Sequence, residues 1–272
     1  MGKFDGFLIC TDLDGTLLNS KREISDENVA AIRHFQKEGG IFTFVTGRMP
    51  QYAKECYDLV KPNGPVGCVN GGGLYDFEKQ EYLWTQELPY EAVELISAID
   101  EAYPEIGIQV AAFSKSYFCK YNDTLVNFRQ YNHLPDYRCH YARVPEPMAK
   151  VLFGTDDELL MQQLKHALRS HPKADNFGFV RTQSNLFEIL PQGVCKGTAI
   201  EKLVELLGLD INKTIALGDY DNDISMFHAA KLGVAVANAC PDALAAADYV
   251  TVSNDEHAIA KIIAQLEAGE LL

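Results

Sequence analysis

The stretch FLICTDLDGTLL, residues 7–18, decides the fold because it joins a buried strand to a pair of acids. The apolar, β-rich run FLICT predicts a short strand, and Asp12 and Asp14 follow where that strand ends, in a turn eased by Gly15. Two carboxylates about 4 Å apart repel each other by roughly 4 kcal/mol at an effective dielectric constant near 20. A structure that gathers them needs a cation or a proton nearby. Because an Asp–Gly pair is also common in solvated turns, the rest of the sequence must supply that partner.

The composition indicates a globular protein without a polyanionic partner. The chain has 272 residues, of which 47% are hydrophobic, enough for one large domain or two smaller ones. Its formal net charge of -14 argues against binding to nucleic acid or to an anionic membrane surface. No apolar run approaches the length that spans a membrane. Since the seven cysteines form no C-x-x-C pair and Lys3 and Asp5 interrupt the N-terminal residues, we expect a reduced, soluble, cytoplasmic protein.

Strand and helix signals alternate along the first 70 residues. The helical segment opens with Ser25 as a predicted N-cap and ends at the glycine pair Gly39–Gly40. Strands this continuously apolar predict a parallel sheet covered on both faces, with ligands bound beyond the carboxyl ends of the strands. The elements expected after the first strand are a helix over residues 25–40, a strand over 41–48, a helix over 51–61 and, over 66–73, a strand that runs into a glycine turn.

The same alternation resumes at about residue 191, whereas residues 84–189 hold the single tryptophan, most tyrosines and shorter strands. We therefore predict a discontinuous α/β core, residues 1–83 and 190–272, with an inserted α+β domain over residues 84–189. In the second core block we expect helices over 196–209, 221–233 and 241–247 and from about 256, with strands over 214–219, 234–237 and 249–252. In the insertion we expect strands over 117–121, 150–154 and 186–190 and helices near 90–102 and 156–170.

A second group of acids lies in ALGDYDND, residues 216–223. Asp219 closes an apolar strand, and Asp223 lies at the start of the helix that follows. In a parallel sheet Asp219 and Asp12 would project at the same edge, so that several acids converge. A hard divalent cation, Mg²⁺ above all, resolves the repulsion, since it takes carboxylate and water ligands.

Two further motifs offer groups that bind phosphate. In VTGR, residues 45–48, Thr46 provides a hydroxyl and Gly47 a backbone amide at the end of a strand, although this tripeptide also occurs in ordinary turns. Arg48 is placed either to contact an anion or to face water. In GVCKGTAI, residues 193–200, Lys196 stands at the entry to a helix, where it opposes the helix dipole. That cost indicates a positive charge required in place, with a plain surface lysine as the alternative. The motif is not a Walker A loop because Lys196 precedes the glycine.

In chain order, DLDGTL, TGR, KG and GDxxND resemble the four motifs of the haloacid dehalogenase superfamily. The resemblance extends over essentially the whole chain. The insertion is similar in position and length to the type IIB (C2) cap of the Cof-type phosphatases, and VNGGG, residues 69–73, resembles the Asn–Gly turn that precedes that cap. The resemblance implies a Rossmann-like parallel-sheet core with an inserted α+β cap domain.

The resemblance also implies roles for the residues of the motifs. Asp12 would attack phosphorus and form an aspartyl-phosphate, and Asp14 would act as general acid and base. Mg²⁺ would be held by Asp12, by the backbone carbonyl of Asp14 and by Asp219. Asp223 would contact the metal through water or orient Lys196, which is also implied as a catalytic residue.

Phosphate or substrate would be bound by Thr46, Gly47, Lys196 and Asn222. The implied function is Mg²⁺-dependent hydrolysis of small phosphate monoesters, with sugar phosphates as the expected class. The partner is then a small phosphorylated metabolite, and the chain is expected to be a monomer or a homodimer.

Other functions remain open from the sequence. A phosphomutase of the same superfamily would use the same nucleophile and return phosphate to a sugar. A non-catalytic binding module would not need both Asp12 and Asp14. A cysteine phosphatase is excluded, because no cysteine here is followed six residues later by an arginine.

Overall fold

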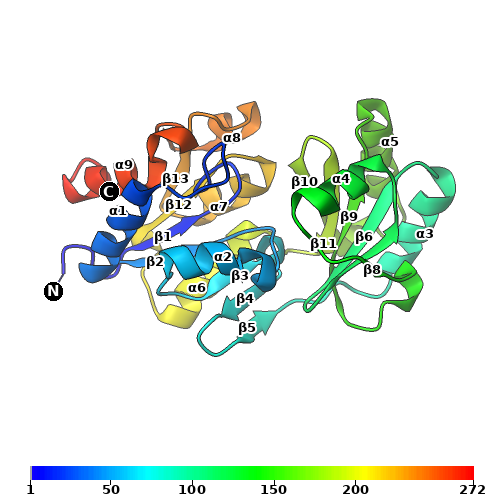
Figure 1. Cartoon of the computed structure of the whole chain (residues 1–272), viewed down its shortest axis with the longest axis horizontal. Helices are drawn as coiled ribbons and strands as arrows, with labels where there is room; N and C mark the ends of the chain where they lie inside the picture. Colours follow the sequence, from blue (N-terminus) through cyan, green and yellow to red (C-terminus); the bar gives the residue numbers. More distant parts are fainter. Residues whose placement is uncertain (1) are drawn as a thin grey trace. The chain divides into compact units, whose positions relative to one another are not determined.

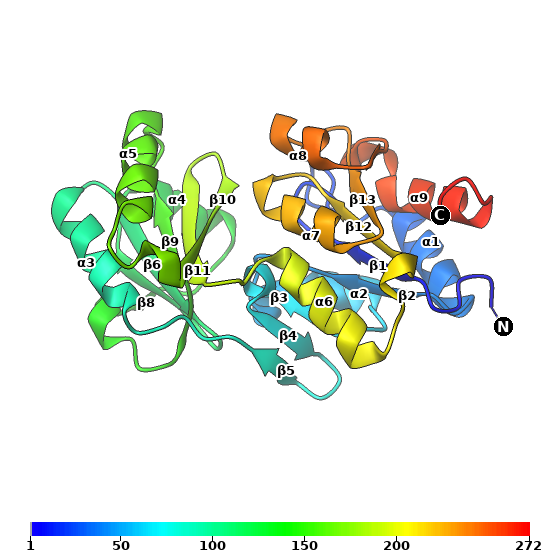
Figure 2. The same cartoon turned by 180° about the vertical axis from the view of Figure 1, so that it is seen from behind.

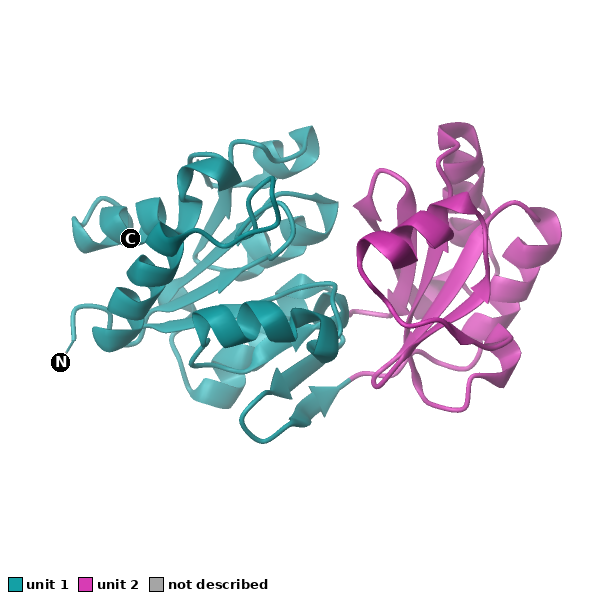
Figure 3. Cartoon of the chain, in the orientation of Figure 1, with its two compact units in different colours: residues 1–85, 195–272 teal, residues 86–194 magenta. Residues whose placement is uncertain are grey.

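The computed structural model describes residues 2–272 and divides the chain into two compact units (Figure 3). Unit 1 contains the chain up to Thr85 and again from Cys195, and unit 2 contains Gln86–Val194. The inserted segment predicted from sequence, residues 84–189, differs from unit 2 at both ends. Trp84 belongs to unit 1 because strand β5 (Glu81–Thr85) pairs with strand β4 (Gly73–Asp76), and strand β11 of unit 2 continues to Pro191.

Unit 1 is built on five parallel strands in the order β14-β13-β12-β1-β2. Every residue of β1 is buried, and its last residue, Thr11, lies opposite Phe44 on one side and Leu217 on the other. The predicted parallel α/β sheet is confirmed. The strands are β1 (Leu8–Thr11), β2 (Ile41–Phe44), β12 (Thr214–Gly218), β13 (Leu232–Ala235) and β14 (Tyr249–Val250).

Helices cover both faces of this sheet, α1 and α9 on one face and α6 and α7 on the other (Figures 1 and 2). Leu8 and Cys10 of β1 pack in one apolar cluster with Leu203 of α6 and Phe227 of α7. Ser25 caps α1 as predicted, since its side chain accepts a hydrogen bond from the Asn28 amide at 3.3 Å. The helices are α1 (Asp26–Lys37), α2 (Pro50–Val60), α6 (Lys196–Leu207), α7 (Ile224–Ala229), α8 (Pro241–Ala246) and α9 (Ala258–Glu267).

The strand predicted to run into a glycine turn over residues 66–73 is present as β3 (Val66–Cys68) followed by a tight turn, and the hairpin β4–β5 comes after it. A parallel bridge from Val45 to Gly67 joins β3 to the main sheet. In the turn Asn70 has a φ of 56° and Gly71 a φ of 94°. A Cβ on Gly71 would lie 1.8 Å from the Cys195 carbonyl oxygen, so glycine allows this turn to pass directly against the start of α6.

The helix predicted over residues 221–233 is wrong in its second half. A short 3₁₀ turn (Asp221–Asp223) leads into α7, which ends at Ala229, and β13 already begins at Leu232. A Cβ on Gly233 would lie 2.5 Å from the Cβ of Phe227, so α7 crosses β13 at close range and the chain turns between them. The apolar spacing of a short segment does not reveal such a turn.

Unit 2 is a six-stranded sheet in the order β10-β11-β9-β6-β7-β8. Its pairs are antiparallel except β7 and β8. Helices α3 and α5 pack on one face in an apolar cluster that includes Val151 and Phe153, while α4 lies over Gly107 and Gly154 on the other. The expected α+β character is present, but β6, β8, β10 and α4 were not predicted.

The unit 2 elements are α3 (Ala92–Ala102), β6 (Gly107–Ala112), β7 (Ser116–Lys120), α4 (Asp123–Tyr131), β8 (Tyr137–Arg138), β9 (Met148–Gly154), α5 (Glu158–Arg169), β10 (Phe177–Gln183) and β11 (Leu186–Pro191). Among residues 2–272, none of the helices has both the length and the hydropathy to cross a membrane.

Candidate active site

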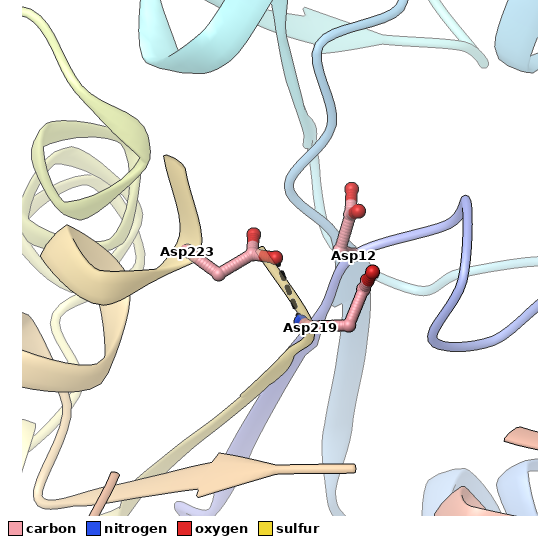
Figure 4. A group of neighbouring side chains, drawn as sticks. All are labelled: Asp12, Asp219 and Asp223. Atoms are coloured by element: carbon pink, nitrogen blue, oxygen red, sulfur yellow. Dashed lines mark hydrogen bonds between the residues drawn. The ribbon is translucent and has the colours of Figure 1, made fainter. Parts of the chain in front are cut away.

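Three carboxylates meet at the carboxyl edge of the unit 1 sheet. Asp12 follows β1 and Asp219 follows β12, and these two strands are paired neighbours. One oxygen from each of Asp12, Asp219 and Asp223 lies within 4.8 Å of the others. Figure 4 shows Asp12 and Asp219 side by side, with Asp223 reaching toward them from the turn before α7. Asp12, which is far from the other two acids in sequence, therefore forms one cluster with Asp219 and Asp223.

Lys196 places a fixed positive charge inside this cluster. Its side chain is fully buried, and Nζ lies 2.7 Å from Oδ1 of Asp12 and 2.5 Å from Oδ1 of Asp223. Burial alone would lower the pKa of the ammonium, but the two carboxylates outweigh it and hold that pKa above its usual value. The lysine stays protonated, and the alternative of a surface lysine is excluded by its burial.

Asp223 holds the turn that follows β12. Its Oδ2 accepts hydrogen bonds from the backbone amides of Asp219 at 2.8 Å and Tyr220 at 2.9 Å, while Oδ1 accepts from Lys196. A Cβ on Gly218 would lie 2.4 Å from the Cβ of Asp223, so the glycine makes room for this side chain. Both oxygens of Asp223 thus have partners within unit 1, and the contact with Lys196 is direct.

The cluster holds its acids at an electrostatic cost. Burial raises the pKa of Asp12 well above its usual value; Lys196 offsets part of this, and the carboxylates of Asp223, Asp219 and Asp14 add to it. Burial, followed by repulsion from Asp223, raises the pKa of Asp219 to about 7, although the Thr16 hydroxyl donates to Oδ1 at 2.6 Å and opposes the shift. A set of crowded carboxylate oxygens that resists ionisation is the donor set that a hard divalent cation such as Mg²⁺ prefers.

Asp14 lies outside the three-carboxylate cluster and is held by arginine. Arg48 donates from Nη2 to Oδ1 at 2.5 Å and from Nε to Oδ2 at 2.8 Å, a bidentate pair, and its Nη1 donates to the Tyr52 carbonyl at 3.1 Å. Arg22 adds a second guanidinium 3.9 Å from the same carboxylate. The sequence left two positions open for Arg48, in contact with an anion or facing water. In the structure its guanidinium contacts an anionic group, the Asp14 carboxylate. The role of Arg22 was not predicted.

The remaining predicted residues join in a network beside the cluster. Thr46 is buried; its hydroxyl accepts from the Arg48 amide at 3.2 Å, and its carbonyl accepts from the Asn70 amide at 3.0 Å. Asn222 Nδ2 donates to Asn70 Oδ1 at 3.1 Å, and a Cβ on Gly47 would lie 2.9 Å from that same oxygen. The structure therefore brings Thr46, Gly47 and Asn222 together through Asn70, which the sequence indicated only as a junction residue.

A parallel α/β fold that carries an acid pair, a hydroxyl and an acid cluster at strand ends, with a buried lysine at the start of a helix, defines a class of hydrolase. The chain belongs to the haloacid dehalogenase-like hydrolase family, whose model matches residues 9–263. It is 30% identical over 271 residues to YxeH of Bacillus subtilis (strain 168), with 95% of this chain and 97% of that protein covered.

Two further likenesses extend over nearly the whole chain. The 5-amino-6-(5-phospho-D-ribitylamino)uracil phosphatase YwtE of Bacillus subtilis (strain 168) is 29% identical over 290 residues, with 96% of this chain and 98% of that protein covered. The crystal structure of a haloacid dehalogenase-like hydrolase from Bacteroides thetaiotaomicron superposes with a TM-score of 0.82 at 26% identity and covers 96% of this chain and 99% of its own.

Proposed function

We propose that this protein is a Mg²⁺-dependent phosphatase that hydrolyses small phosphate monoesters through an aspartyl-phosphate on Asp12. The observation that carries the proposal is the pairing of Asp12 with the buried ammonium of Lys196 at 2.7 Å, within an acid cluster at a sheet edge. The family membership and the phosphatase activity in the name of the relative YwtE support the reaction class.

The substrate class is the finer part of the proposal. YwtE is named for a phosphate ester on a ribityl chain, a polyhydroxylated alcohol. A sugar phosphate or sugar-alcohol phosphate is the corresponding choice for this chain. We also propose that unit 2 is a type IIB cap, which its place in the chain between β5 and α6 supports.

Asp12 supplies the nucleophile. One carboxylate oxygen attacks phosphorus, the bond from phosphorus to the ester oxygen breaks, and the phosphoryl group is carried on Asp12 until water releases it. Lys196 favours the ionised form of Asp12 and offers its charge to the phosphoryl oxygens. Asp223, which shares Lys196 with Asp12, fixes that ammonium in place.

Mg²⁺, held by Asp12, the Asp14 carbonyl and Asp219, with Asp223 through water, would supply the positive charge that screens the carboxylates from the incoming phosphate. The Thr46 hydroxyl, the Gly47 amide and Asn222 would bind phosphoryl oxygens.

Asp14 is the proposed general acid and base. It would protonate the leaving oxygen in the first step and take a proton from the attacking water in the second. In this structure both of its oxygens accept from Arg48, so proton transfer requires that at least one of those hydrogen bonds is exchanged for substrate. Arg48 is thus a positioning residue for Asp14.

The test is release of inorganic phosphate from a panel of sugar phosphates, nucleotides and phosphorylated cofactors with Mg²⁺ present. We expect release that stops in excess EDTA and in Asp12→Asn. Release that persists in either case would overturn the proposal. A phosphomutase would instead isomerise sugar phosphates with a bisphosphate activator and release little phosphate. A binding module would keep its ligand affinity in Asp12→Asn and show no turnover in either form.

The seven cysteines are all free thiols, which supports placing the protein in a reducing compartment such as the cytoplasm.

A further inference from the structure

Two cysteines of unit 2, Cys119 and Cys139, lie near each other at the edge of its sheet. Strands β7 and β8 pair in parallel, with Tyr117 opposite Tyr137 and Phe118 opposite Arg138. The pairing ends at Arg138, and Cys119 and Cys139 are the next residue along each chain. Neighbouring strands lie about 4.8 Å apart. That spacing is inside the range of roughly 4.4–6.8 Å that a disulfide allows between Cα atoms.

The two cysteine side chains also lie close together. The rings of Tyr117 and Tyr137 are 6.4 Å apart between centroids, so both point to the same side. Because side chains alternate along a strand, Cys119 returns to that side. Cys139, one residue beyond the end of β8, lies close enough to contribute to the raised pKa of Cys119. The other cysteines within strands have different neighbours: Cys10 lies opposite Thr43 and Ala216, and Cys68 lies opposite Gly73.

The surroundings of the two thiols differ. Cys119 packs against the core of unit 2, and burial raises its pKa to about 12, with Cys139 among the neighbours that add to the shift. Its Sγ donates to the Tyr117 carbonyl at 3.5 Å. Cys139 follows Arg138 and precedes His140 in a partly exposed segment, and its Sγ donates to the Arg143 carbonyl at 3.2 Å. Because burial keeps the Cys119 thiol protonated while Cys139 lies in a partly exposed segment, reaction begins at Cys139.

We propose that Cys119 and Cys139 form a reversible intrachain disulfide when the protein meets a peroxide. The Cys139 thiolate attacks one peroxide oxygen, the O–O bond breaks, and the sulfenic acid forms as hydroxide leaves and is protonated to water. The Cys119 sulfur then attacks the Cys139 sulfur and displaces hydroxide, which takes the Cys119 proton and leaves as a second water. The two thiols lose two electrons to one peroxide, and a dithiol reductant reverses the step.

The disulfide closes a ring of chain that contains α4 and ties the two-residue edge strand β8 to β7. Such a bond is of the transient, redox-sensing kind found in reducing compartments rather than a structural bridge. We therefore expect residues 132–147 to be less mobile in the oxidised protein than in the reduced protein.

The experiment treats the full chain with equimolar hydrogen peroxide, blocks remaining thiols with iodoacetamide in denaturant, and identifies peptides by mass spectrometry before and after dithiothreitol. We expect the thiol count to fall from seven to five, with one peptide pair joining Cys119 to Cys139 and lost on reduction. Limited proteolysis should cut residues 132–147 more slowly in the oxidised protein.

The variants Cys119→Ser and Cys139→Ser should each abolish the joined peptide pair. The matched control Cys240→Ser, which removes a partly exposed cysteine of unit 1, should keep it. Circular dichroism establishes that each variant is folded. The proposal is overturned if seven thiols remain, if the joined pair involves another cysteine, or if Cys139 is oxidised to sulfinic acid while Cys119 stays free. None of these readouts depends on phosphatase activity.

Discussion

Replacing Asp219 with asparagine should stabilise the metal-free protein while weakening its response to Mg²⁺. The asparagine keeps an oxygen that can accept from the Thr16 hydroxyl, which lies 2.6 Å from Oδ1 in the wild type. The substitution removes one negative charge from a cluster whose three carboxylates lie within 4.8 Å of one another. Repulsion among the remaining acids therefore falls, but so does the number of charged ligands for a divalent cation.

The magnitude follows from the shift in pKa. In the unfolded chain Asp219 titrates near 3.8, whereas burial and Asp223 raise its pKa in the folded protein to about 7. Between these values the folded state holds a proton that the unfolded state has released, so the free energy of unfolding falls as pH rises from about 4 to about 7. A shift of about three pKa units, at roughly 1.4 kcal/mol per unit, sets an upper limit of about 4 kcal/mol on the stability that the substitution can add. Because the titration of Asp219 is coupled to that of Asp12 and Asp223, we expect the variant to gain only about 2 kcal/mol in free energy of unfolding at pH 8.

The assay is urea unfolding of wild type and Asp219→Asn in EDTA across pH. The variant should be the more stable by about 2 kcal/mol at pH 8, and the difference should vanish near pH 4. With Mg²⁺ at a hundred times the dissociation constant, the wild type should gain about 2.7 kcal/mol. The variant should gain much less, which reverses the order. Asp221→Asn, in the same turn but outside the cluster, is the control and should leave the pH dependence unchanged. A metal-free Asp219→Asn protein no more stable than wild type at pH 8 would refute the reasoning.

Three other substitutions test the ion pairs. Arg48→Met should lower kcat about 100-fold on alkyl phosphates, because Asp14 loses its support as general acid, and much less on a nitrophenyl ester, whose leaving group needs no proton; equal losses on both would contradict this role. Lys196→Met should lower the free energy of unfolding by about 3–5 kcal/mol in urea, since it leaves buried carboxylates unpaired, and a loss below about 1 kcal/mol would be inconsistent with the pairing. Lys150→Met should destabilise unit 2 by a similar amount, because Lys150 lies 2.7 Å from the buried Glu188, while the double variant with Glu188→Leu should recover most of the loss.

The sequence indicated the fold and the acids of the site because both depend on strand ends. A buried apolar run followed by Asp12 or by Asp219 indicates where a strand ends. Parallel pairing then brings the carboxyl ends of these strands to one edge of the sheet. The unfavourable place of Lys196 at a helix start indicated that a positive charge is required there, but not that the side chain is buried. These features are local in sequence and can be interpreted without knowing the tertiary contacts.

Other features depend on contacts that the sequence pattern does not contain. The strand and glycine turn over residues 66–73 were predicted, but the hairpin β4–β5 and the fit of the turn at Gly71 against Cys195, far away in the chain, were not. The end of α7 is set by its close crossing over Gly233. The bidentate pair between Arg48 and Asp14 joins loops after two adjacent strands, and only their register shows that these loops meet.

Because Lys196 bridges Asp12 and Asp223, the chain carries its own counterion for two of the three clustered acids. We therefore expect the chain to fold before any metal binds, in contrast with small zinc domains that assemble only around their ion. On the proposed function, such a folded, metal-free protein would become active as soon as a divalent cation is available, with no need for new synthesis or refolding.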